Sequence, residues 1–314
     1  MEVRVVIVGA GIAGLTAARA LRQKGVESVL VDKSRAVGGR MATRTIGDAR
    51  FDHGAQHFGI RSERFGEIAR VWREEGVMRE WYRTENLEPR NVGVGGMRRI
   101  PEYLAADLDV RTATSVERVE QDGSGVAVVA ANGDRIQGSA AIVTPPIPQT
   151  IALLSAGQID LPAGLEKTLA AIHYQACLAV MLQPDGPTGL PDGHLSDAGG
   201  SIAWIADNAD KGTSPVPSLT IHSTPAFAAR HLEESPEQWK SLLVTEARRW
   251  VGGPATGAVG HRWRFAEPTS IVDLGSVLLD APVALAGEVF AGARVEGAVL
   301  SGLAAADAII ERLP

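Results

Sequence analysis

Six residues near the start of the chain constrain the fold more than any other feature. Residues 9–14 read G-A-G-I-A-G, a G-x-G-x-x-G pattern, and they directly follow the apolar, β-branched run Val3–Val8. From Ile12 to Lys24 the apolar residues recur at helical spacing, and Ser28–Asp32 is a second apolar run. Strand, helix and strand within about 30 residues form a βαβ unit, so we predict a parallel sheet that binds a dinucleotide.

Each glycine of this pattern has a separate physical reason. Gly9 permits a tight turn, Gly11 lets the backbone approach a pyrophosphate, and Gly14 lets the helix pack closely on the strand. The phosphates then meet the free N–H groups at the start of the helix. Asp32 ends the second strand, where a carboxylate can accept hydrogen bonds from a ribose.

A second glycine pair distinguishes FAD from NAD. Gly38 and Gly39 precede Arg40, so a second loop can lie on the pyrophosphate while the guanidinium supplies a forked, charged donor. The string R-x-x-G-G-R at 35–40 resembles the one that follows the βαβ unit in the amine oxidase-like flavoprotein superfamily, where it marks FAD. We therefore expect non-covalent FAD as the cofactor.

Other segments resemble the same superfamily. Residues 95–97 match its Gly-Gly-Met turn, and Val116 stands where the family's adenine contact lies. Residues 294–298 open the last helix, whose positive end can stabilise a reduced flavin. Pattern and resemblance together predict cofactor contacts at Gly9, Gly11, Ile12, Ala13, Gly14, Asp32, Lys33, Gly39, Arg40, Met41, Ala55, Gln56, Val116, Thr144, Gly287, Glu288, Val295, Glu296 and Ala298.

The middle of the chain has a different character. Strand-like runs at Gln175–Leu182, Ser201–Ala206 and Ser218–His222 alternate with loops, whereas Val283–Ala286 and Gly297–Leu313 return to buried strand and helix. We predict an α/β fold: a Rossmann-type FAD-binding domain with an inserted, mainly antiparallel β substrate domain, as in amine oxidases and p-hydroxybenzoate hydroxylase. The expected division is 1–60, 92–158 and 255–314 for the first domain, and 61–91 and 159–254 for the second.

Several segments resemble one family more closely, the bacterial renalases. They are DHGAQHF at 52–58, AWIADN at 203–208, IHSTP at 221–225, HRWRFA at 261–266 and RVEGAVLSG at 294–302. The resemblance implies an oxidase that takes hydride from 2- or 6-dihydro-NAD(P), returns NAD(P)+ and passes electrons to O2, forming H2O2. Because hydride loss restores the aromatic ring, we expect no obligatory acid–base pair and name no catalytic side chain.

A substrate pocket then needs residues that stack and form hydrogen bonds. The resemblance and composition predict Gln56, His57, Phe58, Arg61, Trp204, Asn208, His222 and Trp263. Core packing is an equal possibility for the tryptophans, and a structural role for His222. The chain also departs from the family. Glu288 replaces its aspartate, residues 289–293 lack its tryptophan, and His57 replaces its tyrosine, which leaves the substrate open.

Two other functions remain possible from sequence. An amine oxidase-like flavoenzyme would attack a C–N or C–H bond of another small molecule, but those relatives commonly hold water on a lysine at the flavin. None of the chain's five lysines lies in a segment that we expect near the flavin ring. The third possibility is a non-catalytic flavin-binding protein.

Bulk composition excludes several classes of function. A net charge of −6 and a pI near 5.7 argue against a nucleic-acid surface, and no apolar stretch is long enough to span a membrane. The single cysteine, Cys177, excludes an intramolecular disulfide and a cysteine-cluster metal site, and its apolar surroundings predict a packed thiol. We expect a cytoplasmic protein that uses a dinucleotide substrate and O2, without metal. Its oligomeric state is open.

Overall fold

A six-stranded sheet is built around the first predicted strand. The computed structural model describes residues 4–251 and 254–313, so Val3 lies outside the described residues. β1 pairs in parallel with β2 and β11, and β11 with β18, as the βαβ pattern predicts. In sheet order the strands are β17 (Val277–Leu278), β18 (Val283–Leu285), β11 (Ala140–Val143), β1 (Arg4–Val8), β2 (Glu27–Val31) and β7 (Asp109–Arg111).

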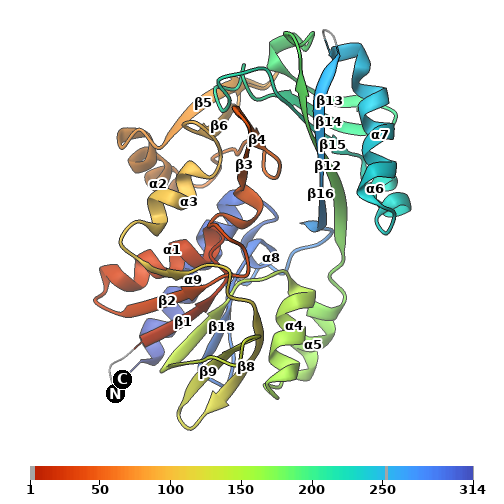
Figure 1. The fold of residues 1–314 in the computed structure, drawn as a ribbon. Helices are drawn as coiled ribbons and strands as arrows, with labels where there is room; N and C mark the ends of the chain where they lie inside the picture. Colours follow the sequence, from red (N-terminus) through yellow and green to blue (C-terminus); the bar gives the residue numbers. More distant parts are fainter. Residues whose placement is uncertain (1–3, 252–253, 314) are drawn as a thin grey trace.

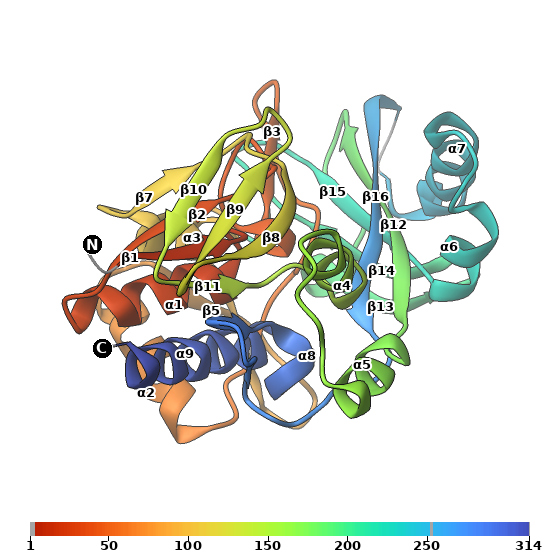
Figure 2. The same cartoon turned by 90° about the horizontal axis from the view of Figure 1, so that it is seen from below.

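Both faces of this sheet are covered, which explains why its central strands are mostly apolar. Helices α1 (Ile12–Gln23) and α9 (Val295–Arg312) pack on one face, and β8–β10 with α4 (Ile147–Ala156) on the other (Figure 2). The α1–α9 approach is close: a Cβ on Gly302 would stand 2.3 Å from the Ala13 carbonyl oxygen. Glycine at that position is therefore a packing requirement.

The stretch that follows the Asn132-Gly133 turn forms two strands. β10 ends at Gly138 and β11 starts at Ala140. Gly138 lies against Arg4, whose carbonyl oxygen also accepts the Ser139 N–H at 2.8 Å. The chain turns there and passes from the antiparallel sheet to the parallel one. The antiparallel sheet consists of β8 (Val116–Asp122), β9 (Gly125–Ala130) and β10 (Arg135–Gly138).

The predicted inserted sheet is antiparallel and has five strands (Figure 1). Its order is β13 (His194–Gly199), β14 (Ile202–Asp207), β15 (Leu219–Ser223), β12 (Tyr174–Pro184) and β16 (Ala255–Pro268). Helices α6 (Pro225–His231) and α7 (Pro236–Ala247) cover its outer face around buried Trp239. Helix α7 begins with the capping box predicted at Ser235 and Gln238. Because β16 pairs with β12, we propose that the inserted domain extends to Pro268.

The remaining elements are short and mostly lie beside or between the two large sheets (Figure 1). They comprise the hairpins β3 (Thr43–Ile46) with β4 (Ala49–Asp52) and β5 (Met78–Arg83) with β6 (Pro89–Gly93), helices α2 (Glu63–Glu74), α3 (Arg99–Ala105), α5 (Ala163–Ala170) and α8 (Glu288–Ala291), and turns η1 (Gly39–Met41), η2 (Pro191–Gly193) and η3 (Arg248–Trp250). Across residues 4–251 and 254–313, no helix has the length and apolar character needed to cross a membrane.

A buried polar network joins the two sheets through Asp52, the last residue of β4. The Asp52 N–H donates to Asn208 Oδ1 at 3.1 Å, and its carbonyl oxygen accepts from Thr220 Oγ1 at 3.0 Å. Its carboxylate accepts from the Met97 N–H at 2.9 Å and from Thr213 Oγ1 at 3.1 Å. Backbone and side chain of one residue thus fix the inserted sheet against the nucleotide-binding half.

Lys211 completes this network. Its ammonium lies 2.9 Å from Asp52 Oδ2, both side chains are 0% exposed, and the Trp81 ring lies 5.2 Å from the ammonium. Burial lowers the pKa of Lys211, and Asp52 opposes that shift. A buried ion pair contributes little net stability, but removal of one partner leaves the other as an uncompensated buried charge.

We predict that Lys211→Met lowers the free energy of unfolding by about 3–5 kcal/mol, because it leaves the buried Asp52 carboxylate without its counter-charge. The double variant Asp52→Asn/Lys211→Met should recover part of this loss. Lys240→Met, which removes a pair with the exposed Glu237 carboxylate, should cost less than about 1 kcal/mol. Denaturant unfolding of the four proteins measures this. Equal losses in the two lysine variants would contradict it.

Candidate functional site: two glycine loops and an aromatic wall

The three glycines of the first loop differ in their surroundings as their spacing predicts. Gly9 has a φ of +104°, and a Cβ there would stand 2.3 Å from Thr144 Oγ1. A Cβ on Gly14 would stand 2.1 Å from the Gly9 carbonyl oxygen. A Cβ on Gly11, in contrast, would meet no protein atom within 4 Å. The space beside Gly11 is where the pattern places a pyrophosphate.

The second glycine loop lies directly against the first. The Gly38 N–H donates to the Ala10 carbonyl oxygen at 2.9 Å, and Gly11 and Gly38 form a parallel bridge. Asp32 fixes this arrangement, since its carboxylate accepts the Ala10 and Ser34 N–H groups, each at 2.7 Å. A ribose would therefore share a carboxylate that also holds the loop.

Arg40 and Glu288 close the far side of the loops. The guanidinium binds both carboxylate oxygens of Glu288 at 2.6 Å, and its side chain is 30% exposed. Glu288 was predicted to bind a ribityl hydroxyl, but here it is oriented by Arg40. Neither α1 nor α9 has a side-chain cap at its N-terminus, so the first N–H groups of both helices are available to an anion. Loops, helix ends and guanidinium fit FAD.

The other predicted cofactor residues are placed in different ways. Met41 is buried, Thr144 Oγ1 donates to the Val8 carbonyl oxygen at 2.8 Å, and the Glu296 carboxylate accepts the N–H groups of Arg61 and Ser62 at 2.9 and 2.7 Å. Gly39 contacts Gly11 as part of the loop pair. The remaining predicted positions are Ile12, Ala13, Lys33, Ala55, Val116, Gly287, Val295 and Ala298. Three of them already use their N–H groups, because Ala55 donates to the Arg40 carbonyl oxygen, Gly287 to Ser301 Oγ and Ala298 to the Arg294 carbonyl oxygen. We keep all eight positions as proposals.

The face of the inserted sheet opposite α6 and α7 is lined by rings, and we call it the inner face. Trp204 pairs with His222 across β14 and β15, and His261 and Trp263 alternate along β16. Trp263 stacks on His53 with centroids 5.4 Å apart and donates from Nε1 to the His53 carbonyl oxygen at 2.7 Å. His222 Nε2 lies 3.0 Å from the same oxygen. The predicted flavin loop is thus held against this sheet.

A second group of half-buried rings continues the inner face, and we call it the aromatic wall: His57, Trp81, Tyr82, His194 and Trp204. His57 lies 5.3 Å from Trp204 and 5.6 Å from Tyr82, centroid to centroid. His194 stacks on Trp204 at 5.1 Å and contacts Tyr82 at 3.9 Å. The wall combines residues of the flavin loop, β5, β13 and β14, which are far apart in the sequence.

Three buried histidines of this region have a pKa well below the ordinary value for histidine. Burial lowers the pKa of His57 to about 3, with further lowering by the charges of Lys211 and Arg90. Burial, helped by His261, also lowers the pKa of His53 to about 3, and burial lowers that of His222 to about 4. Burial raises the pKa of Cys177 to about 12, which makes it a protonated, unreactive thiol as predicted.

Two predicted pocket residues are structural instead. Asn208 is fully buried and uses its side chain on Asp52, Ser218 and Thr220. Phe58 is 4% exposed and packs edge-to-face on other core rings. His57, the sequence neighbour of Phe58, does face the wall, because successive residues of an extended segment point to opposite sides. Arg61 is exposed, and its N–H binds Glu296.

Sequence reasoning missed Lys211, His53, Trp81, Tyr82, His194 and His261. The expectation that no lysine lies in a segment near the flavin ring stays a prediction, although Lys211 contacts Asp52, the first residue of DHGAQHF. The adjacent Trp81 and Tyr82 and the alternation of His261 with Trp263 were available signals. In the part of the chain that the structure describes, no cluster of three or more His, Cys, Asp or Glu could hold a metal ion.

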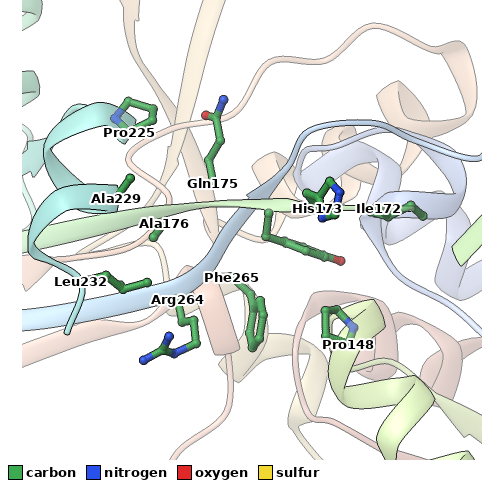
Figure 3. A pocket seen from close by; sticks show the side chains of 11 residues that line it. Pro148, Ile172, His173, Gln175, Ala176, Pro225, Ala229, Leu232, Arg264 and Phe265 are labelled. Atoms are coloured by element: carbon green, nitrogen blue, oxygen red, sulfur yellow. The ribbon is translucent and has the colours of Figure 1, made fainter. Parts of the chain in front are cut away.

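A separate cavity of about 490 Å³ lies where the inserted sheet meets α4 (Figure 3). Pro148, His173, Phe265 and Arg264 line it, with Pro225 and Leu232 at the α6 side. None of the predicted cofactor or substrate residues lines this cavity. It is on the side of the sheet that α6 covers, so we do not assign it to the redox site.

Comparisons with known proteins agree with this geometry. The model of the flavin containing amine oxidoreductases matches residues 61–310, and that of the NAD(P)-binding Rossmann-like domain matches residues 7–74. The chain belongs to the flavin containing amine oxidoreductase family, an α/β fold whose cofactor is FAD. The predicted fold class and cofactor are confirmed.

Among solved structures, putrescine oxidase bound to putrescine superposes with a TM-score of 0.71 at 17% identity, over 99% of this chain and 100% of that one. A candidate protoporphyrinogen oxidase from Exiguobacterium sp. 255-15 gives 0.75 at 13% identity, over the full length of both. Hydroxyneurosporene desaturase of Rubrivivax gelatinosus is 47% identical over 58 residues, 18% of this chain and 11% of that protein. These likenesses establish the fold and leave the substrate open.

We predict that Gly11→Val yields folded protein without flavin. The φ of −77° suits valine and the protein leaves room for it, but the side chain occupies the place of the pyrophosphate. Gly164→Val, in α5, is a matched control because a Cβ there also meets nothing within 4 Å. Absorbance of the purified proteins reports flavin content. Full flavin in Gly11→Val would refute this placement of the phosphates.

A second prediction concerns pH. Folded His53 stays neutral down to about pH 3, whereas unfolded histidine binds a proton below about 6.5. The unfolded state therefore gains protons first, and this histidine lowers stability as pH falls from 6.5 towards 3. Relative to His53→Phe, the wild type should lose up to about 1.4 kcal/mol per pH unit between pH 6 and 4. Parallel stability curves would argue against the buried neutral ring.

Proposed function

We propose that the protein oxidises isomeric dihydronicotinamide dinucleotides, 2- or 6-dihydro-NAD(P), with O2 as the acceptor, as the renalase-like motifs imply. The observation that carries this proposal is the aromatic wall opposite the cofactor loops. It offers flat rings for stacking a planar heterocycle, and it includes buried polar atoms that a ligand could satisfy. Five rings from three separate parts of the chain meet there, and the packing of one strand alone does not require so many.

Charge around the wall supports an anionic substrate. Arg90 and Arg294 lie close enough to His57 to lower its pKa, whereas the charge of Lys211, which also lowers it, is balanced by Asp52. A dinucleotide carries two phosphate charges that such positive charges attract, whereas an ammonium substrate is repelled. The carboxylate of Asp52, a possible partner for an amine, is already bound to Lys211.

Oxidation of a dihydronicotinamide needs positioning from the side chains and little chemistry. The net reaction is dihydronicotinamide plus O2 plus a proton, giving oxidised nicotinamide and H2O2. Bound FAD supplies hydride acceptance and the subsequent electron transfer to O2. The wall orients the heterocycle and excludes water, and hydride loss needs no proton from His57, whose pKa is low.

The second candidate is an amine oxidase-like enzyme, favoured by the family and by the likeness to putrescine oxidase. An enzyme of this kind needs a lysine that is free to hold water beside the flavin. Lys211 is the one lysine that contacts the flavin loop in the described structure, and its ammonium is bound to Asp52 under Trp81. The pair and the positive field therefore favour the dinucleotide.

Anaerobic mixing of the FAD-loaded protein with 6-dihydro-NAD or 2-dihydro-NAD tests the proposal. We expect the flavin band near about 450 nm to bleach, and more slowly with ordinary NADH. Admission of O2 should return the band with NAD+ and H2O2 in equal amounts. Bleaching by putrescine and other amines alone would support the second candidate. A flavin that neither class bleaches would indicate a non-catalytic flavin-binding protein.

A further inference from the structure

We propose that Trp204 and His57 bind the carboxamide group of the nicotinamide. Trp204 donates to the carboxamide oxygen, and His57 accepts from the carboxamide nitrogen. This inference rests on the function proposed above and goes beyond it, because it names the two atoms that distinguish a nicotinamide from other flat heterocycles.

The two atoms are buried and lack partners. Within the described residues, neither Trp204 Nε1 nor His57 Nδ1 has a hydrogen-bond partner, and neither nitrogen is accessible to solvent, so the carboxamide reaches them when the two rings move apart. Their rings lie 5.3 Å apart, centroid to centroid, and both residues are half-buried. Buried polar atoms are normally satisfied, so a pair of them on one wall indicates a ligand that supplies the missing hydrogen bonds.

The chemistry of the pair is that of an amide receptor. An indole N–H can only donate, whereas a neutral imidazole accepts through one of its nitrogens. Because the pKa of His57 is lowered to about 3, the ring keeps that lone pair at neutral pH. A primary carboxamide presents one acceptor and one donor side by side. A carboxylate would place a second acceptor against His57, and a methyl ketone would place a methyl group there.

Most neighbouring polar groups of the inner face are already used. His53 Nδ1 also has no partner, but its ring packs against His261 and Trp263 and is not part of the aromatic wall. His194 Nδ1 lies 3.0 Å from the Asp192 carbonyl oxygen, and Trp263 Nε1 and His222 Nε2 both bind the His53 carbonyl oxygen. Gln56 Oε1 is also unpartnered, but its amide is held at Asp52 and Gly54. Trp204 and His57 are thus the ring pair on the wall with free, complementary capacity.

The test compares the carboxamide dinucleotide with two analogues. In the 3-acetylpyridine analogue a methyl group replaces the NH2, and in the thionicotinamide analogue sulfur weakens the acceptor. Calorimetry of the oxidised forms gives the dissociation constants, and anaerobic flavin reduction by the corresponding dihydro forms gives the rates. Comparing the ratio of dissociation constants or rates for two analogues across the variants cancels the analogues' own differences in reactivity.

We expect the wild type to bind the carboxamide about tenfold more tightly than the acetyl analogue. His57→Phe should abolish that preference by weakening the carboxamide complex alone. Trp204→Phe should weaken the carboxamide and acetyl complexes alike, and the thioamide complex least. His194→Phe, a ring on the same wall whose Nδ1 is already bonded, should keep the wild-type ratio. Flavin content and the unfolding midpoint verify that each variant folds.

The outcomes separate the two proposals. A carboxamide preference that survives in His57→Phe, or that His194→Phe removes equally, overturns this inference and leaves the proposed function standing. If no dihydronicotinamide reduces wild-type flavin, the proposed function fails, and the carboxamide assignment fails with it.

Discussion

The site depends on one buried residue, Asp52. It receives hydrogen bonds from the nucleotide-binding half through Thr43 and the Met97 N–H, and from the inserted sheet through Thr213 and Thr220. Lys211 balances its charge in an environment that excludes water. Such a pair stabilises the fold only modestly against an apolar alternative, but it penalises any arrangement that separates the partners. The relative placement of the two sheets therefore has few alternatives.

The network also sets the chemical character of the site. Asp52 begins the loop that carries Gln56 and His57, and Lys211 contributes to the low pKa of His57. One interaction thus holds the loop, contributes to the low pKa of His57 and occupies the ammonium of Lys211. The family is named for amine oxidation. These properties instead support the proposed substrate, which carries negative charge and a ring that becomes aromatic on oxidation.

The nucleotide-binding half was largely predictable because its signals are local. Gly9, Gly11 and Gly14 have different surroundings, yet each follows from a rule about neighbours within one βαβ unit. The helix start at Ser235 was equally local. The break at Ser139 was not, because it depends on Arg4, which lies beside it only in the folded sheet.

The inner face and the aromatic wall were only partly predictable, because the facing of a side chain and the pairing of distant residues are not local properties. Gln56, His57, Trp204, His222 and Trp263 were identified from motifs, but Phe58 and Asn208 were included with them because a motif does not show which side of a segment faces the core. Lys211 and Asp52 are distant in the sequence, and their pairing is a property of the tertiary structure. Trp81, Tyr82 and His194 joined the wall through strand pairing that composition alone does not specify.

A crystal structure of the FAD-loaded protein with bound NAD+ would test the central claim most directly. The account predicts the nicotinamide against Trp204 and His57, its carboxamide between their ring nitrogens, and Lys211 still paired with Asp52. A dinucleotide bound away from the wall, or Lys211 released from Asp52 and turned towards the flavin, would contradict it.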